Sequence, residues 1–342
     1  MSTSKLPKQF HDILGTGETL IQQTFRRLRK LSDLDKILIV THKNYLSLVK
    51  EQLPDLPEKN IILEPARRNT APCITYAAYR IKAQDPTATM LVAPADHLIT
   101  DEDEFVRIAK LAQKESEGSR QLFTLGIKPH RPDTGYGYLQ FIDLEEDPKA
   151  EVKRVKTFTE KPDEAMAHQF LESGEFLWNS GIFIWSLNTY LEELHENLPD
   201  MYAAFEGGAD KFGTEEEESF INEMYPSCEN ESIDYGLMEK SMHVYVIPSS
   251  FGWSDLGTWG SLHSHASLDD DKNAIMGNRV VSYDSKNSII RVPKDKVAVV
   301  EGLDGYIVVD TANALLVCPV EKEQLIKTFV SDLKLKYGDK IT

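Results

Sequence analysis

The stretch Thr89–His97, TMLVAPADH, decides the fold of this chain of 342 residues. Its first half is a continuous apolar run, which is typical of a buried strand in a parallel sheet. Asp96 then follows closely behind the run, and in open α/β sheets ligands bind outside the carboxyl ends of the strands. Asp96 is therefore a candidate cation ligand, although a structural turn aspartate would look the same. We expect the neighbouring His97 to pack against it or to support it.

Similar apolar runs occur on both sides of this stretch and alternate with helical patterns. The runs are KILIVT at Lys36–Thr41, NIILEP at Asn60–Pro65 and QLFTLGI at Gln121–Ile127. The helical patterns start after Thr19, which with Gln22 forms a capping box, and continue at 71–84 and 104–115. This alternation predicts an α/β fold with a doubly wound sheet and right-handed crossovers.

The pattern changes after about Gly135. The segments 135–141 and 152–162 resemble paired strands, followed by a helix at Asp163–Glu172 and a strong strand at Leu177–Leu187. The acidic segment Glu206–Glu218 is interpreted as a solvated loop or helix face without chemistry.

The segment SLDDDKNAIMGN at Ser267–Asn278 indicates a domain boundary. Beyond it, short strands separated by turn residues are predicted at 279–285, 288–293, 297–303, 306–311 and 314–319, before a helix over about Lys322–Leu335. We therefore predict a first domain over residues 1–268 and a small all-β module over 269–342.

Composition and charge exclude several classes of protein. The net charge is −17, from 38 basic and 55 acidic residues, so the surface repels nucleic acid and anionic membranes, though not a small phosphorylated ligand. There is no secretory signal pattern and no apolar run of about 18 residues that could span a membrane. The three cysteines are far apart and form no CxxC pair, which favours packing roles in a reducing cytoplasm.

Other polar residues stand where they could carry chemistry. Asp255, in FGWSDLGTWG, is either a ligand or part of a tight turn anchored by tryptophans. Glu160 and Lys161 end one predicted strand and Asn179 starts another, where they could bind sugar hydroxyls and a phosphate or simply be exposed. In EPARRNTAP, Thr70 is the expected N-cap of the next helix. The chain has no GxGxxG, GxxxxGK[ST], HExxH or GxSxG motif.

Seven motifs in this order resemble the mannose-1-phosphate guanylyltransferases of the sugar-nucleotide pyrophosphorylase superfamily. They are LPKQF, EPARRNTAP, APADHLI, DTGYGYLQF, FTEKP, WNSGIFIW and WSDLGTW. The resemblance runs from Met1 to at least Trp259, and the β-rich tail matches the short, single-function form. It implies a Rossmann-like mixed nucleotidyltransferase sheet followed by a β-helix-like module.

The resemblance also implies a reaction and its residues. GTP and mannose 1-phosphate would give GDP-mannose and pyrophosphate by in-line attack, with positioning and charge neutralisation as the main catalytic contributions. Asp96 and Asp255 would hold Mg²⁺, and a homodimer is implied. Lys8 would contact the nucleotide phosphates, and Lys161 the sugar phosphate. The remaining implied ligands are Asn69, Thr70 and Ala71 for the guanine edge, and Gly137, Glu160 and Asn179 for the sugar.

The start of the chain departs from the family pattern. The family begins with a buried strand and a loop resembling GGxGxRLWPxS, and Ser2 corresponds to the last serine of that loop. We expect the natural protein to have this segment upstream of Met1. Two alternatives are a non-catalytic homologue that binds sugar phosphate and a nucleotidyltransferase for another hexose 1-phosphate.

Overall fold

The computed structural model describes residues 6–147 and 149–338, so the expected counterpart of the phosphate-loop serine, Ser2, lies outside the described residues. The chain divides into two compact units. We call residues 25–95 and 99–253 the central unit, and residues 1–24, 96–98 and 254–342 the terminal unit. The predicted boundary at residue 268 stays a prediction.

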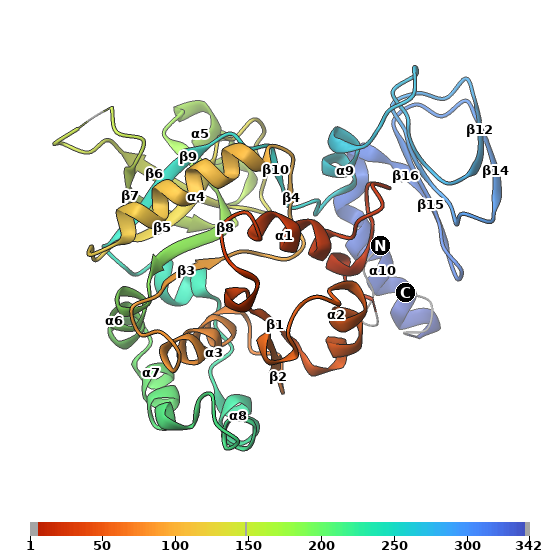
Figure 1. The fold of residues 1–342 in the computed structure, drawn as a ribbon. Helices are drawn as coiled ribbons and strands as arrows, with labels where there is room; N and C mark the ends of the chain where they lie inside the picture. Colours follow the sequence, from red (N-terminus) through yellow and green to blue (C-terminus); the bar gives the residue numbers. More distant parts are fainter. Residues whose placement is uncertain (1–5, 148, 339–342) are drawn as a thin grey trace. The chain divides into compact units, whose positions relative to one another are not determined.

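A six-stranded mixed sheet forms the core of the central unit (Figure 1). Its strand order is β3-β8-β5-β9-β7-β6. The strands are β3 (Thr89–Val92), β5 (Leu122–Ile127), β6 (Gly137–Ile142), β7 (Lys153–Glu160), β8 (Phe176–Ser186) and β9 (Val244–Ser249). Two further strands, β1 (Ile39–His42) and β2 (Ile61–Glu64), form a separate parallel pair. The predicted antiparallel pairing of 135–141 with 152–162 is confirmed by β6 and β7.

The main sheet is mixed, as the family resemblance implies, so the expectation that the apolar run at Thr89–Val92 lies in a parallel sheet is wrong. Strand β8 runs antiparallel to both β3 and β5, and only β5 and β9 pair in parallel. Within β8, Phe183 and Trp185 face one apolar core, whereas Ile182 and Ile184 face the other. A continuous apolar run reports burial on both faces but not the direction of the strand, so sequence alone could not distinguish the two arrangements.

Helices cover both faces of this sheet. The helices of the central unit are α2 (Leu46–Gln52), α3 (Thr70–Lys82), α4 (Glu102–Ser116), α5 (Glu164–Ser173), α6 (Leu187–Asn197), α7 (Pro199–Glu206) and α8 (Glu217–Met224). Helices α3, α6 and α7 contribute to one core and α4 to the other, and they lie on opposite sides of the sheet in Figure 1. Within the acidic segment, Glu217 is not solvated as predicted, because it is buried and accepts from Tyr76 at 2.9 Å and Arg80 at 2.6 Å.

Helix α1 (Leu20–Leu28) starts at the predicted capping box, where the Thr19 amide donates to Gln22 Oε1 at 2.9 Å. The start of α3 differs from the prediction. Asn69, with φ of 68°, is the N-cap and accepts from the Thr70 amide, so Thr70 is the first helical residue. Asparagine tolerates this left-handed backbone better than threonine does, because threonine is β-branched.

Two parallel sheets build the β-rich part of the terminal unit. One contains β11 (Ala274–Met276), β13 (Ile289–Arg291), β15 (Tyr306–Asp310) and the antiparallel β16 (Leu315–Pro319). The other contains β12 (Arg279–Tyr283) and β14 (Val297–Glu301). From β11 to β15, successive strands alternate between the two sheets, which is the connectivity of a β-helix. Five buried residues form its core: Ala274, Ile289, Ile307, Val309 and Cys318.

Helix α9 (Trp259–His265) precedes this β-rich part in the chain, and η8 (Val320–Leu325) and α10 (Ile326–Tyr337) follow it. The terminal unit also contains the short helix η1 (Lys8–Phe10). The predicted last helix is present, but its first turns are 3₁₀-helical. Two-residue strands β4 (Leu98–Ile99) and β10 (Trp253–Ser254) complete the described strands. No described helix is long and apolar enough to cross a membrane.

Candidate active site

A cluster around Lys8 joins three segments that are far apart in the sequence. Its Nζ atom lies 2.9 Å from Asp96 Oδ2 and donates to the backbone oxygen of Asp255 at 2.5 Å. All three residues belong to the terminal unit. The structure thus brings together the three residues that the sequence assigns to the nucleotide phosphates and the cation.

Opposing effects act on the Asp96 carboxyl. Burial alone would raise its pKa, but the nearby charges of His97 and Lys8, with the hydrogen bond from Lys8, lower it below its usual value. The imidazole Nε2 of His97 lies 3.7 Å from Asp96 Oδ1, so His97 supports Asp96 as expected. Asp96 is consequently an anion at neutral pH.

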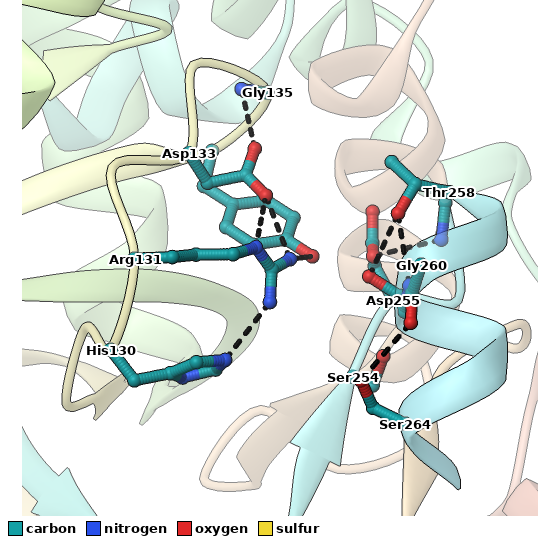
Figure 2. A network of polar contacts seen from close by, with 12 residues as sticks. His130, Arg131, Asp133, Gly135, Ser254, Asp255, Thr258, Gly260 and Ser264 are labelled. Atoms are coloured by element: carbon teal, nitrogen blue, oxygen red, sulfur yellow. Dashed lines mark hydrogen bonds and ion pairs between the residues drawn. The ribbon is translucent and has the colours of Figure 1, made fainter. Parts of the chain in front are cut away.

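Asp255 lies in a tight turn, and this turn explains the sequence WSDLGTW. Leu256 has a φ of 46°, and its amide donates to Ser254 Oγ at 3.1 Å. The Gly257 amide donates to Asp255 Oδ1 at 2.9 Å, and Thr258 then caps α9 (Figure 2). The turn alternative considered for Asp255 is therefore present, and the same turn directs its backbone oxygen to Lys8.

Asp96 and Asp255 suit a hard cation by chemistry. Magnesium prefers oxygen ligands and is commonly held by one or two protein carboxylates together with substrate phosphates. Within residues 6–147 and 149–338 there is no group of three or more His, Cys, Asp or Glu side chains arranged for a metal. The binding of Mg²⁺ by Asp96 and Asp255 stays a prediction.

A second cluster lies in the central unit and contains the residues expected to bind the sugar phosphate. Gly137 at the start of β6 pairs with Glu160 at the end of β7. The Nζ of Lys161 donates to Glu160 Oε1 at 2.6 Å, and this bond raises the pKa of Lys161. Asn179 lies inside β8 rather than at its start, and it is 9% exposed.

A side chain at position 137 would displace the Glu160 carboxylate from its observed position. A Cβ atom there would lie 2.4 Å from Glu160 Oε2 and 3.4 Å from the Cβ of Asn179. The glycine therefore lets the backbone of β6 approach both side chains, as its proposed contact with a sugar would require.

The loop before Gly137 is held by an ion pair. Arg131 donates through Nη2 to Asp133 Oδ2 at 2.7 Å, while Asp133 Oδ1 accepts from the Gly135 amide at 2.8 Å (Figure 2). The backbone amide of Asp133 donates a hydrogen bond to the Tyr138 hydroxyl at 3.0 Å. This network accounts for DTGYGY as a turn that fixes the start of β6.

Sequence reasoning missed Asp234, which joins the second cluster. The Asn179 Nδ2 atom donates to Asp234 Oδ1 at 2.8 Å. Burial and the negative charge of Glu160 raise the pKa of Asp234 to about 6. A single aspartate in the segment SIDYGLM has no strand-end or spacing signal that could have identified it.

The residues expected to contact guanine are placed at the start of α3. Asn69 and Thr70 are exposed, whereas Ala71 is buried. The Thr70 hydroxyl accepts from the Ile233 amide at 2.8 Å, and the Ala71 amide donates to the Glu231 oxygen at 3.0 Å. These two bonds anchor the segment before Asp234, and the guanine contact itself stays a prediction.

The cysteines behave as packing residues. Cys73, Cys228 and Cys318 are free thiols, and the latter two are buried. Burial raises the pKa of all three, that of Cys228 to about 11. Because the thiolate is the reactive form, none of them is suited to act as a nucleophile.

Comparison with known proteins places this geometry in a family. Residues 2–272 match the model described as Nucleotidyl transferase, and residues 278–333 match the MannoseP isomerase/GMP-like beta-helix domain. The alginate biosynthesis protein AlgA of Pseudomonas aeruginosa is 35% identical over 97% of this chain and 69% of its own length. A mannose-1-phosphate guanylyltransferase of Salmonella montevideo is 36% identical over 98% of this chain and 71% of its own length.

A solved structure agrees with these relatives. The crystal structure of "mannose-1-phosphate geranyltransferase" from Thermus thermophilus superposes with a TM-score of 0.85 at 27% identity, covering 97% of this chain and 94% of the other. The mixed nucleotidyltransferase sheet and the C-terminal β-helix module predicted from the sequence are thereby confirmed. The chain belongs to the nucleotidyl transferase family, among the mannose-1-phosphate guanylyltransferases, and is a nucleotidyltransferase that acts on a nucleotide and a sugar phosphate.

Proposed function

We propose that the chain transfers a guanylyl group from GTP to mannose 1-phosphate and releases pyrophosphate. The observation that carries this proposal is the convergence of Lys8, Asp96 and Asp255 from three distant segments. Relatives named for this activity, at 36% identity over nearly the whole chain, support the choice of base and sugar.

The reaction needs positioned charges rather than a covalent intermediate. An oxygen of the sugar phosphate attacks the α-phosphorus of GTP, forming one P–O bond. The bond from the α-phosphorus to the oxygen that bridges to the β-phosphate breaks, and pyrophosphate leaves with that electron pair. Aligning the two phosphates and neutralising their charge therefore accounts for the catalysis.

The Lys8 cluster supplies these charges on the nucleotide side. Asp96 is kept ionised by its neighbours, so it can serve as a cation ligand at neutral pH. Asp96 and Asp255 would hold Mg²⁺, which when bound neutralises charge on the reacting phosphates. Lys8 would exchange its contact with Asp96 for the phosphate oxygens of the nucleotide.

The Glu160 cluster serves the sugar phosphate. Lys161, with more than half of its side chain exposed, can turn from Glu160 to the phosphate of the sugar. Glu160 would then accept a hydrogen bond from a sugar hydroxyl, and Gly137 leaves room for the ring beside it.

The proposal is tested by incubating the purified chain with Mg²⁺, GTP and mannose 1-phosphate and following products by ³¹P NMR. We expect GDP-mannose and pyrophosphate in equal amounts. A panel of four nucleoside triphosphates and of glucose, fucose and galactose 1-phosphates provides the comparison. Faster turnover of another pair would replace the proposed substrates, and sugar-phosphate binding without any product would indicate a non-catalytic homologue.

A further inference from the structure

The amide group of Asn179 is almost fully engaged within the protein. Its Oδ1 atom accepts from the Thr124 hydroxyl at 2.9 Å and from the Gly181 amide at 3.2 Å, while Nδ2 donates to Asp234 Oδ1 at 2.8 Å. A side-chain amide has two N–H donors and an oxygen that accepts two hydrogen bonds. Among the described residues, one Asn179 N–H is therefore left to meet a ligand.

The partners of Asn179 also determine which position of its side-chain amide is occupied by oxygen and which by nitrogen. The Gly181 amide can only donate, so it must face the oxygen of Asn179. The ionised carboxylate of Asp234 can only accept, so it must face the nitrogen. Without Asp234, rotation of Asn179 would be opposed only from its oxygen side, and the last N–H would lose its fixed direction.

Asp234 itself is held in place by α3. The residue immediately before it, Ile233, donates its amide to Thr70 Oγ1 at 2.8 Å. The oxygen of Glu231 accepts from the Ala71 amide at 3.0 Å. Two hydrogen bonds from the first turn of a thirteen-residue helix therefore restrain the segment that carries the Asp234 carboxylate.

The surroundings of Asp234 make its ionised form energetically unfavourable. The side chain is largely desolvated and is repelled by Glu160, and these two effects outweigh the hydrogen bonds from Asn179 and from the Asp234 amide and the charge of Lys161, which favour its ionised form. A neutral acceptor could hold Asn179 without this electrostatic cost. Perturbed carboxylates of this kind cluster at functional sites, where their placement serves binding or chemistry rather than stability.

We propose that Asp234 is a positioning residue of the sugar-phosphate site, which orients the remaining N–H of Asn179 toward a hydroxyl of the bound hexose 1-phosphate. The inference rests on the proposed function, since it assigns the ligand of that site. It assigns Asn179 a donor role and leaves Glu160 as the acceptor for a neighbouring hydroxyl.

The test measures initial rates of the full chain with Mg²⁺ while GTP and mannose 1-phosphate are varied in turn. We expect Asp234→Ala to raise KM for mannose 1-phosphate at least about tenfold, the effect of one lost well-oriented hydrogen bond to a ligand. KM for GTP should stay within about twofold, since among the described residues the side chain of Asp234 bonds to Asn179 and not to Lys8, Asp96 or Asp255. Asp234→Asn, which keeps an acceptor oxygen, should restore KM to within about threefold of the wild type.

Glu217→Gln is the matched control, because Glu217 is a carboxylate of the central unit that is at least as buried as Asp234 but contacts Tyr76 and Arg80 instead. It should lower the melting temperature and leave both KM values unchanged. An unchanged KM for mannose 1-phosphate in Asp234→Ala, or equal rises in both KM values, would overturn the inference. Absence of any product with the wild-type chain would instead overturn the proposed function, so the two failures are distinguishable.

Discussion

Asp96 and Asp234 are both partly buried carboxylates, yet their pKa values move in opposite directions. Burial raises the pKa of each, but Asp96 lies beside His97 and Lys8, whereas Asp234 lies beside the like charge of Glu160. The counter-charges therefore determine the outcome, not the burial. In the Lys8 cluster the cation lies directly beside Asp96, whereas in the Glu160 cluster Lys161 bonds to Glu160 and Asp234 retains the repulsion of that carboxylate.

The largest effect should come from removing the Asp255 charge. Asp255→Asn keeps an oxygen that can accept from the Gly257 amide, so the turn should survive. Loss of a cation ligand should still lower kcat by about 10²–10³-fold, the range seen when one charge-stabilising group is removed. Rates at saturating substrates together with a melting curve check this, and full turnover in the variant would remove Asp255 from the cation site.

The next effect concerns the sugar-phosphate cation. Lys161→Met should raise KM for mannose 1-phosphate by about 10–100-fold, because a charge-assisted hydrogen bond is worth roughly 1.5–3 kcal/mol. Lys240→Met is the matched control, since Lys240 is likewise exposed and in the central unit. Equal KM values in the two variants would contradict the assignment of Lys161.

Stability should respond to Asp234 in a pH-dependent way. Because the pKa of Asp234 is raised to about 6 in the folded chain, the native state binds more protons than the unfolded state between about pH 4 and 6. Its contribution to stability therefore falls as pH rises through this window. The side chain of Asn does not ionise, so Asp234→Asn does not lose stability as pH rises. We therefore expect its free energy of unfolding at pH 7.5 to exceed that of the wild type by on the order of 1–3 kcal/mol.

Urea unfolding at several pH values measures this difference. The gain of the variant should disappear by about pH 4, where the aspartate is neutral in both states. If Asp234→Asn were less stable than the wild type at pH 7.5, ionised Asp234 would stabilise the native state, which would contradict the prediction.

The smallest effect is expected at Lys8. The lowered pKa of Asp96 means that its ion pair stabilises the fold above its usual pKa and is lost as pH falls through the lower, folded-state value. Lys8→Met should therefore reduce stability at pH 7 by about 1 kcal/mol, a typical value for a partly exposed pair. Lys8→Arg should retain most of the stability, and a pH-independent loss in Lys8→Met would argue against the ion pair.

Much of this molecule could be predicted from its sequence, and the failures have physical causes. Apolar runs located β1, β2, β3 and β5 because each strand overlaps a short, continuous apolar segment bounded by polar residues. They could not show that β8 lies between β3 and β5 and runs antiparallel to both, since strand direction depends on chain connectivity. The turn residues between the short apolar segments of the terminal unit predicted its β-rich module, because each short strand there ends at such a turn.

In the candidate site, too, some residues could be predicted from the sequence and others could not. Lys8, Asp96 and Asp255 were predicted because each stands in a distinctive motif, and the structure brings them together. Asp234 was missed because its importance comes from its spatial neighbours, Asn179 and Glu160, which lie 55 residues or more away in the sequence. A desolvated like-charge pair leaves no trace in local composition.

The central claim is that the Lys8 cluster serves the nucleotide and the Asp234–Asn179 pair serves the sugar phosphate. Steady-state kinetics of Lys8→Met and Asp234→Ala, with GTP and mannose 1-phosphate varied separately, tests it most directly. The account predicts that Lys8→Met raises KM for GTP alone and that Asp234→Ala raises KM for mannose 1-phosphate alone. If both substitutions raised KM for the same substrate, the assignment of the two clusters to different substrates would be wrong.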